Sequence, residues 1–401
     1  MSASPGRGLI LVENLSVPFD RRVWQEARSL VAAGWEVSVI CPRGRRQDTE
    51  PYALVDGVEI HRYALEAAGG GAPTYAREYA SALFQTARLV RRLTRGRGFD
   101  VVHACNPPDA LILTSLAARR EGAGIIFDHH DLVPELYVSR FGRKGLLHRA
   151  TLVAERLAFR VADVVVSTNE SYRRVAIGRG RKRPEDVFVV RSAPDLTRFR
   201  PLPPDPSLRR SREHLLAYLG VMGPQDGVDH ALRALAILKE TRTDWHATFI
   251  GAGDVFEEMV SLAAELGLGE DVDFTGRIPD EDVIRILCTA DVCLSPDPRN
   301  PLNDVSTMNK IVEYMALGRP IVSYDLTEAR VSAAEAALYA APDDTRDFAR
   351  CISVLLDSPA EREAMGEVGR RRVAEEISWS HSEAHLLAAY ERAVELGARR
   401  R

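Results

Sequence analysis

A lysine and a glutamate lie three residues apart near the start of a predicted helix, at Lys310 and Glu313 of the segment DPRNPLNDVSTMNKIVEYMALGRPIV. Apolar side chains follow at helical spacing, and Gly318 and Pro320 predict the end of the helix. The amides of a helix N-terminus, together with a lysine, form a site that suits a diphosphate. A carboxylate one turn further along can accept hydrogen bonds from two sugar hydroxyls. The alternative interpretation is a surface helix with an i,i+3 ion pair.

The length of the chain predicts more than one domain. With 401 residues it is too long for one ordinary hydrophobic core. Five prolines between Pro194 and Pro206 interrupt the periodic pattern. We therefore expect a first domain at residues 1–200 and a second at residues 201–379, with a C-terminal helix at about 380–401 that packs back on the first domain.

Strand-like and helix-like segments alternate in both halves of the chain. A strand at Leu9–Val12, a helix at Val23–Ala33 and a strand at Glu36–Cys41 form the start of a doubly wound fold. A second alternating series begins at Leu215–Leu219. We therefore expect an α/β protein of two Rossmann-like, doubly wound parallel-sheet domains that face a central cleft. No GxGxxG sequence follows the first strand, so the dinucleotide-binding fingerprint is absent.

Two local patterns give further expectations in the first half. Val55–Tyr63 predicts one strand, and Pro134 predicts a turn. The strand before that turn, Ile125–Asp128, runs directly into two histidines.

Charge is unevenly divided between the two halves. Residues 1–200 hold 31 lysines and arginines against 22 aspartates and glutamates, a net charge of +9, whereas residues 201–401 carry −13. The positive charge concentrates at Arg88–Arg97, Arg140–Lys144 and Arg179–Arg183. These clusters favour an anionic partner such as a membrane surface or a diphosphate-bearing lipid, and the alternative is a solvated arginine-rich face. Nucleic acid is not expected as a partner, because no aromatic residues interleave with the clusters.

Apolar runs and cysteines indicate the cellular compartment. No apolar run is long enough to span a bilayer, and the first residues lack a signal-peptide pattern. The five cysteines include no CxxC pair and suit buried thiols in a reducing compartment. Cys288 and Cys293 are not at zinc-ligand spacing, so no metal site is expected. We expect a cytoplasmic protein. Its basic first domain can place it at the inner face of the membrane as a peripheral protein.

Seven motifs, in order, resemble the retaining glycosyltransferases of family 4, which have the two-domain GT-B architecture. Those of the first domain are VPFDRRVWQEARSLVAAGWEVSVI, FDHHDLVPEL and the linker RSAPDLTRFRP. Those of the second are LGVMGPQDGVDHALRAL, FIGAGDVFEEM, VDFTGRIPDEDV and NKIVEYMALGRPIV. The motifs extend over nearly the whole chain. The resemblance implies an enzyme that moves a sugar from a nucleotide sugar to an acceptor hydroxyl.

The resemblance places the donor site in the second domain. Glu313 matches the second glutamate of the family's E-x7-E motif, which implies a hydrogen bond to the nucleotide ribose. Lys310 would neutralise the donor diphosphate as its charge develops. Further donor contacts, from bare loop backbone, helix-start amides and polar side chains, are expected at Gly220, Gly223, Arg277, Asn303, Asp304, Thr307, Met308 and Asn309.

Three positions depart from the family pattern. The first glutamate of E-x7-E falls on Val305, and the arginine and lysine of the phosphate loop fall on Val221 and Asp226. An acid in that loop is a poor partner for a diphosphate. The expected cations are therefore Lys310 and Arg277.

The first domain contributes a histidine and two arginines. His130 matches the family's histidine, which implies contact with the donor sugar near the reacting carbon; the alternative is a surface residue at the end of a strand. His129 would point to the opposite side of the strand. Arg21 and Arg22 lie in the first loop, where they can contact an anionic acceptor or cap the loop through Asp20.

The resemblance implies front-face transfer with retention, in which the departing diphosphate oxygen helps to deprotonate the acceptor. No metal ion or other cofactor is expected, because no DxD motif lies in a suitable place. We expect a UDP-sugar donor, hexosyl or N-acetylhexosaminyl transfer, and a hydroxyl acceptor such as a lipid-diphosphate-linked glycan in bacterial cell-envelope or exopolysaccharide assembly. The alternatives are a natural-product glycosyltransferase, a nucleotide-sugar 2-epimerase of the same fold, and an inactive nucleotide-sugar-binding protein.

Overall fold

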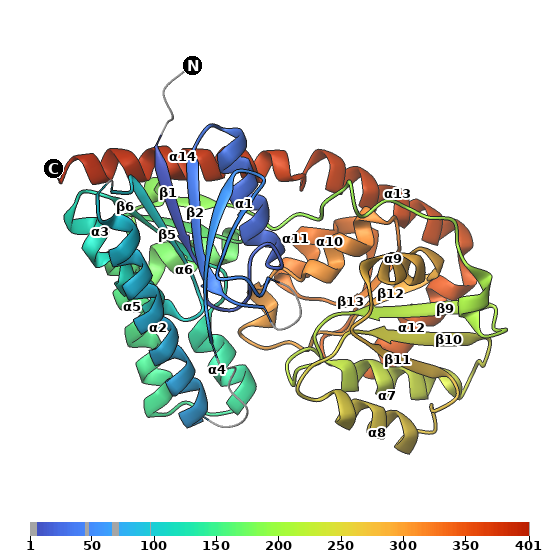
Figure 1. Ribbon diagram of the computed structural model, residues 1–401. Coiled ribbons are helices and arrows are strands. Elements are labelled where there is room, and N and C mark those ends of the chain that lie inside the picture. The colour runs from blue at the N-terminus through green and yellow to red at the C-terminus, as the bar shows by residue number, and fades with distance from the viewer. Residues whose placement is uncertain (1–5, 45–47, 66–71, 97, 401) are drawn as a thin grey trace. The chain divides into compact units, whose positions relative to one another are not determined.

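The computed structural model describes residues 6–44, 48–65, 72–96 and 98–400. The chain divides into two compact units (Figure 1). Unit 1 comprises Met1–Ser192 and Ser380–Arg401, and unit 2 comprises Ala193–Trp379.

The described part of unit 1 contains an eight-stranded sheet in the order β3-β4-β2-β1-β5-β6-β7-β8. Neighbouring strands run parallel, except for the antiparallel pair β3 and β4. The strand order reverses between β1 and β5, so the carboxyl ends of these two strands form the switch point where ligands bind in such sheets. The strands are β1 (Arg7–Leu11), β2 (Glu36–Pro42), β3 (Tyr52–Val55), β4 (Val58–Tyr63), β5 (Val101–Cys105), β6 (Gly124–His129), β7 (Val164–Ser167) and β8 (Val187–Val189).

The strand predicted at Val55–Tyr63 is present as β4 (Val58–Tyr63), but it begins three residues later than expected because the chain turns at Asp56 and Gly57. These two residues have positive φ angles of 48° and 83°. Two consecutive left-handed residues, with glycine second, form the tight turn of a β-hairpin. Strands β3 and β4 therefore pair as a hairpin at the edge of the sheet.

The helices of unit 1 cover its parallel sheet. The prediction of a turn at Pro134 is wrong, because this proline lies in the first turn of a helix, where a missing amide removes no intrahelical hydrogen bond. After Pro108 the chain forms a 3-10 helix, η1 (Asp109–Ser115), followed by a short α-helix. The helices are α1 (Arg21–Ala32), α2 (Ala72–Thr94), α3 (Leu116–Arg120), α4 (Val133–Phe141), α5 (Leu146–Val161), α6 (Glu170–Gly178), the 3-10 helix η2 (Pro184–Asp186) and α14 (Trp379–Ala398).

Helix α14 packs closely on the strands of unit 1. The Tyr390 hydroxyl lies 3.1 Å from Nδ1 of His103 on β5, and the Tyr390 ring meets Trp35 edge-on at 5.0 Å. A Cβ atom at Gly124, the first residue of β6, would lie 2.0 Å from the carbonyl oxygen of Ala393. Glycine at this position therefore allows the helix backbone to approach the strand directly.

The described part of unit 2 contains a six-stranded parallel sheet in the order β11-β10-β9-β12-β13-β14. Its switch point lies between β9 and β12. The strands are β9 (His214–Leu219), β10 (Trp245–Ile250), β11 (Val272–Gly276), β12 (Val292–Ser295), β13 (Ile321–Tyr324) and β14 (Ala337–Ala340). With unit 1, this sheet confirms the predicted fold class of two Rossmann-like parallel-sheet domains.

The core of unit 2 lies between its sheet and helices. Its largest fully buried side chains are Trp245, Tyr218, Tyr314, Tyr324, Phe249 and Phe348. The helices are α7 (Val228–Lys239), α8 (Phe256–Glu265), α9 (Asp280–Thr289), α10 (Asn309–Ala316), α11 (Thr327–Ala333), α12 (Thr345–Asp357) and α13 (Pro359–Glu375), and the 3-10 helices are η3 (Pro206–Arg209), η4 (Asn303–Val305) and η5 (Ala334–Ala336). Among the residues described in either unit, no helix is both long and apolar enough to cross a bilayer.

Candidate functional site

Two loops meet at the switch point of unit 2. The first follows β9 and ends at Gly227, the N-cap of α7, whose φ of 68° lies in the left-handed region. The second follows β12 and begins at Pro296. A Cβ atom at Gly227 would lie 2.1 Å from the carbonyl oxygen of Pro296, so only glycine allows this approach. The sequence thus brings the expected phosphate loop against the segment that carries Lys310.

Glycines also bring the ends of β9 and β10 together. The Gly220 amide donates to the carbonyl of Ile250 at 3.0 Å. A Cβ atom at Gly251 would lie 1.9 Å from the carbonyl oxygen of Gly220. The loop therefore presents backbone rather than side chain at Gly220, as close approach to a phosphate requires.

Lys310 is the buried cation beside this loop. Its Nζ lies 2.7 Å from Oδ1 of Asp297 and 4.9 Å from the centre of the Tyr218 ring. Burial opposes the charged form, but the carboxylates of Asp297 and Asp226 and the Tyr218 oxygen outweigh it and raise the pKa of Lys310. Lys310 therefore carries a positive charge, and its partner in this structure is Asp297.

Asp226 occupies the position where the resembled family has a lysine. Its Oδ2 accepts a hydrogen bond from the Gly223 amide at 2.8 Å and from Nε2 of Gln225 at 3.2 Å. Burial and the nearby Asp297 raise the pKa of Asp226 to about 6, although Lys310 acts in the opposite direction. The acid therefore shapes the loop and titrates near neutral pH.

Asn303 and Asp304 use polar groups to hold the same region together. Nδ2 of the buried Asn303 donates to the carbonyls of Gln225 and Pro298, both at 2.9 Å. The Asp304 carboxylate accepts from the Thr327 amide at 3.1 Å and hydroxyl at 3.0 Å. Asn303 thus holds the backbone of the phosphate loop in place, and Asp304 caps the start of helix α11. The sequence predicted neither of these two structural roles.

The remaining donor-site predictions concern the start of α10 and the end of β11. Thr307 and Met308 precede α10, Asn309 is its exposed first residue, and Glu313 lies half-buried one turn later. Met308, the N-cap residue of α10, makes no side-chain hydrogen bond to the first amides of the helix. Arg277 is exposed directly after β11.

His130 lies at the carboxyl end of β6, near the switch point of unit 1. Its Nε2 is 2.5 Å from Oδ2 of Asp128 and 2.8 Å from Nε of Arg22. One nitrogen cannot both donate to a carboxylate and accept from a guanidinium, so the tautomer decides which contact is a hydrogen bond. Burial opposes ionisation of Asp128, but Arg22 and His130 hold its pKa well below the usual range. The ionised Asp128 favours the proton on Nε2.

The backbone of His130 is fixed as well as its ring. Oδ1 of Asn106, at the end of β5, accepts from the amides of His130 at 2.6 Å and Asp131 at 3.0 Å. Nδ2 of the same asparagine donates to Oδ1 of Asp109 at 2.7 Å. The histidine is thus held by the two strand ends. In contrast, His129 is fully buried and stacks on Phe127.

We revise the prediction that Arg22 binds the acceptor, because its guanidinium is committed inside unit 1. Besides His130, it contacts Asp128 at 3.2 Å and Glu26 at 3.2 Å and donates to the Val190 carbonyl at 2.9 Å. Its neighbour Arg21 is exposed at the start of α1. Arg21 is therefore the member of the pair that can meet an acceptor.

A cluster of four buried groups beside Arg22 could geometrically surround a metal ion: Glu26, His103, Cys105 and Asp128. Burial and the Asp128 charge raise the pKa of Glu26 well above its ordinary value, and burial lowers the pKa of His103. Both shifts favour the neutral forms of Glu26 and His103, and the Arg22 guanidinium pairs with Asp128 at 3.2 Å. The cluster therefore forms a buried network around the Arg22–Asp128 ion pair, and Asp128 in turn contacts His130.

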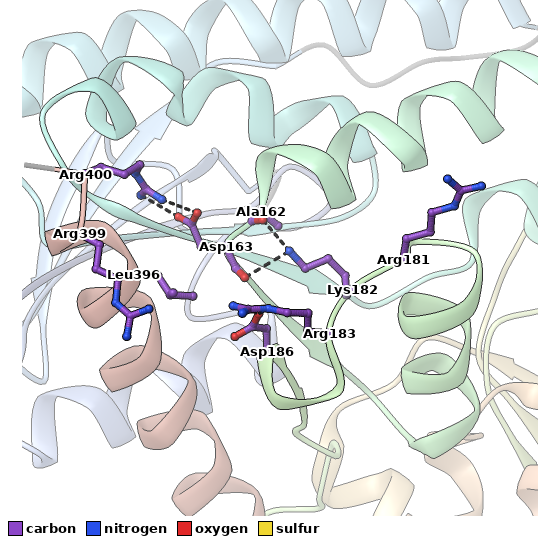
Figure 2. A pocket seen from close by; sticks show the side chains of 9 residues that line it. All are labelled: Ala162, Asp163, Arg181, Lys182, Arg183, Asp186, Leu396, Arg399 and Arg400. Carbon is purple, nitrogen blue, oxygen red and sulfur yellow. Dashed lines mark hydrogen bonds and ion pairs between the residues drawn. The ribbon is translucent and has the colours of Figure 1, made fainter.

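A separate concave region of about 440 Å³ lies at the opposite, amino-terminal edge of the unit 1 sheet (Figure 2). Figure 2 shows Arg400 directed at Asp163 and Lys182 directed at the Ala162 carbonyl. Nη2 of Arg400 lies 2.8 Å from Oδ2 of Asp163, and Nζ of Lys182 donates to the Ala162 carbonyl at 2.8 Å. Arg183 pairs with Asp186 at 2.7 Å. The basic cluster Arg179–Arg183 thus largely holds helices and strands together.

Three candidate functional residues were not predicted from the sequence: Asp128, Asp297 and Glu13. Asp128 and His130 lie two residues apart near the end of a strand, and residues at this spacing share one face, which was the available signal. Glu13 follows β1 at the switch point, and burial, with Glu78, raises its pKa to about 7. No sequence signal marks Asp297 or Glu13, because their burial depends on distant segments.

Comparisons with known proteins agree with this arrangement. Residues 213–358 match the family described as "Glycosyl transferases group 1", and residues 20–193 match "Glycosyl transferase 4-like domain". Together with the two parallel-sheet units, these matches define a glycosyltransferase of the GT-B type.

Individual relatives differ in the sugar that they transfer. The chain is 26% identical over 324 residues to a 2-deoxystreptamine glucosyltransferase of Streptomyces kanamyceticus, covering 79% of this chain and 82% of the relative. It is 28% identical over 319 residues to an MMP α-(1→4)-mannosyltransferase of Mycolicibacterium hassiacum, covering 77% and 74%. Its fold matches that of Anabaena HepE in complex with UDP-glucose, with a TM-score of 0.72 at 15% identity, covering 95% and 98%.

Proposed function

We propose that this glycosyltransferase moves a hexosyl or N-acetylhexosaminyl group, with retention of configuration, from a UDP-sugar to an acceptor hydroxyl, by the family 4 type of mechanism. The observation that carries the proposal is the meeting of the Gly220 loop, Lys310 and the start of α10 at the switch point of unit 2. Bare backbone, a buried cation and helix-start amides together suit a diphosphate.

The proposed chemistry begins with the donor diphosphate over this loop. Lys310 and the first amides of α10 stabilise the negative charge that develops as the bond to the sugar breaks. An oxygen of the departing diphosphate takes the proton of the acceptor hydroxyl, which attacks from the same face. Because charge is stabilised by Lys310, Arg277 and backbone amides, we propose that no metal ion or other cofactor is required.

Side chains near the diphosphate select the rest of the donor. Glu313 accepts hydrogen bonds from the ribose hydroxyls, one turn beyond Lys310. His130, oriented by Asp128, contacts the donor sugar near its reacting carbon. Gly223, Asn303 and Asp304 shape the loop, and we assign them positioning roles because their polar groups hold backbone or a helix end.

For the acceptor we propose a lipid-diphosphate-linked glycan in bacterial cell-envelope or exopolysaccharide assembly, at the cytoplasmic face of the membrane. The excess positive charge of residues 1–200 and the exposure of Arg21 support an anionic acceptor. The five buried, unpaired cysteines suit a reducing compartment. The similarity to a 2-deoxystreptamine glucosyltransferase favours a second candidate, a natural-product acceptor.

The donor proposal is tested by thermal shift with UDP-, GDP- and dTDP-sugars. Binding to the folded protein raises the unfolding midpoint by mass action, and we expect the largest rise with a UDP-sugar. A larger rise of the midpoint with a GDP-sugar would identify a GDP-sugar as the donor instead. No rise with any of the three nucleotide sugars would overturn the donor proposal. Incubation with the donor alone distinguishes a glycosyltransferase from an epimerase, because only an epimerase changes the configuration of the sugar without an acceptor.

The ribose contact is tested with Glu313→Ala. Loss of a charged hydrogen-bond acceptor should weaken UDP-sugar binding about 10-fold or more. Glu258→Ala, at an exposed position on α8, is the matched control and should bind as the unchanged protein does. If the two variants bind the UDP-sugar with equal affinity, Glu313 does not contact the donor.

A further inference from the structure

Helix α5 and the connection before it present apolar side chains to solvent. Eight consecutive residues, Arg140–Leu147, are exposed. Leu146 is 82% exposed and Leu147 52%, and further along the helix Val153 is 54% exposed and Leu157 42%. A single exposed leucine is ordinary, but a series on one element marks an interaction surface.

Three of the four large exposed apolar residues of α5 form one stripe. Each helical residue advances by about 100°, so Leu146, Val153 and Leu157 fall on the same side of the helix. The face that packs on unit 1 is the opposite one, which carries Ala158 and Phe159. The stripe is therefore not a consequence of core packing.

Positive charge borders this stripe. By the same geometry, Arg149, Arg156 and Arg160 form a row directly beside it, and all three are exposed. Arg143 and Lys144 add two exposed cations at the connection. None of these five forms an ion pair or side-chain hydrogen bond with another residue in the described part of the chain.

Residues 140–160 have no exposed acidic side chain. Between Arg140 and Arg160 the chain has six lysines and arginines and one acid, Glu155. Glu155 is fully buried and accepts from Nη2 of Arg179 at 2.6 Å. The exposed face thus combines apolar side chains with the five cations that have no ion-pair partner among the described residues.

We propose that this α4–α5 surface, defined as Arg140–Leu147 together with Arg149, Val153, Arg156, Leu157 and Arg160, docks on an anionic lipid surface. The cations attract the headgroups, and the leucines and valine enter the interfacial layer. A protein partner of the same chemistry, or a second copy of this chain, would not require residues 140–160 to lack exposed acids. Because α4 begins three residues after His130, docking would hold the carboxyl edge of unit 1 at the membrane, where a lipid-linked acceptor lies. The inference rests on the proposed function for the lipid-linked acceptor. Its failure is distinguishable from failure of the transfer proposal, because lipid binding is measured without donor or acceptor.

The test is co-sedimentation of the full chain with vesicles of phosphatidylglycerol and phosphatidylcholine, or of phosphatidylcholine alone, at low and high salt. We expect binding to the anionic vesicles only, weakened by salt because the attraction is screened. Arg149→Glu/Arg156→Glu should weaken it at least 25-fold, at about fivefold for each cation lost. Leu146→Ser/Leu147→Ser should weaken it at unchanged charge, which a purely electrostatic contact would not do.

Two controls match these variants. Leu54→Ser changes a leucine that is 64% exposed on the edge strand β3, and Arg371→Glu reverses an exposed charge on α13. Both should sediment as the unchanged protein does, and all variants should keep their thermal shift with UDP-sugars. The proposal is overturned if the chain ignores anionic vesicles, if the surface variants bind them like the controls, or if Leu146→Ser/Leu147→Ser instead converts a dimer to a monomer in analytical ultracentrifugation.

Discussion

Nε2 of His130 lies 2.5 Å from Oδ2 of Asp128, a carboxylate that is completely buried. The two residues are next-but-one neighbours near the end of β6. Such a buried, ionised carboxylate orients an imidazole and selects its tautomer, as second partners of functional histidines commonly do. The finding makes Asp128 a positioning residue and gives the first prediction.

Asp128→Asn should lower kcat about 10- to 100-fold, with little change in UDP-sugar binding. The amide can donate to Nε2, which moves the imidazole proton to Nδ1. The measurement is steady-state kinetics together with ¹⁵N NMR of the histidine rings. A merely structural role would lower stability without changing the tautomer, so an unchanged tautomer contradicts the prediction.

Arg22 and Arg21 are adjacent in sequence but should respond oppositely to substitution. Arg22→Ala leaves Asp128 without its cation and should lower the free energy of unfolding by about 3 to 5 kcal/mol. Arg21→Ala removes an exposed side chain and should change it by less than about 0.5 kcal/mol, while raising KM for an anionic acceptor. Urea denaturation and acceptor kinetics measure the two effects. Equal losses of stability would show that the Arg22 network is not held as described.

Donor affinity should depend on pH through Asp226, whose pKa is raised to about 6. As the pH falls through this value, the side chain is protonated and loses a negative charge beside the proposed diphosphate site. The affinity for a UDP-sugar should therefore rise about 5- to 10-fold between pH 8 and pH 5, as expected when a like charge near the ligand is removed. The diphosphate of a UDP-sugar stays ionised over this range.

Asp226→Asn is the control for this pH effect. Its amide oxygen can still accept from the Gly223 amide, so the loop is kept while the charge is removed. Isothermal titration calorimetry should show high affinity at both pH values. If the variant retains the pH dependence of the unchanged protein, another group is responsible.

Lys310 has two roles, in the fold and in the proposed donor site, and a pair of variants separates them. Lys310→Met leaves Asp297 buried without a cation and should lower the free energy of unfolding by about 3 to 5 kcal/mol. Adding Asp297→Asn removes that charge and should restore most of the stability, because Asn can still accept from the Ser295 hydroxyl, which lies 2.7 Å from Oδ2 of Asp297. Both variants should lose UDP-sugar affinity by about 10- to 100-fold. Recovery of donor binding in the double variant would confine Lys310 to its structural role.

Periodicity was sufficient for most of the fold. The strand at Leu215–Leu219 and the helix around Lys310 lie where apolar spacing predicts them, because burial of one face or of a whole strand leaves a direct trace in sequence. The Asp56-Gly57 hairpin and helix α4 were missed because their signals are local turn chemistry. A proline marks a helix start as readily as a turn, and only the following residues decide.

Sequence patterns alone are enough to predict two α/β domains, a glycine-bearing loop in the second, and a lysine and glutamate at the start of one helix. These follow from patterns within short segments. Three relationships become visible only in the folded chain. Lys310 pairs with Asp297, Asp226 lies near both of them, and Arg22 contacts His130 instead of solvent. Such roles depend on which charges become neighbours after burial, and removal from water decides which of them stay ionised. That information lies in contacts between strand ends that are distant along the chain.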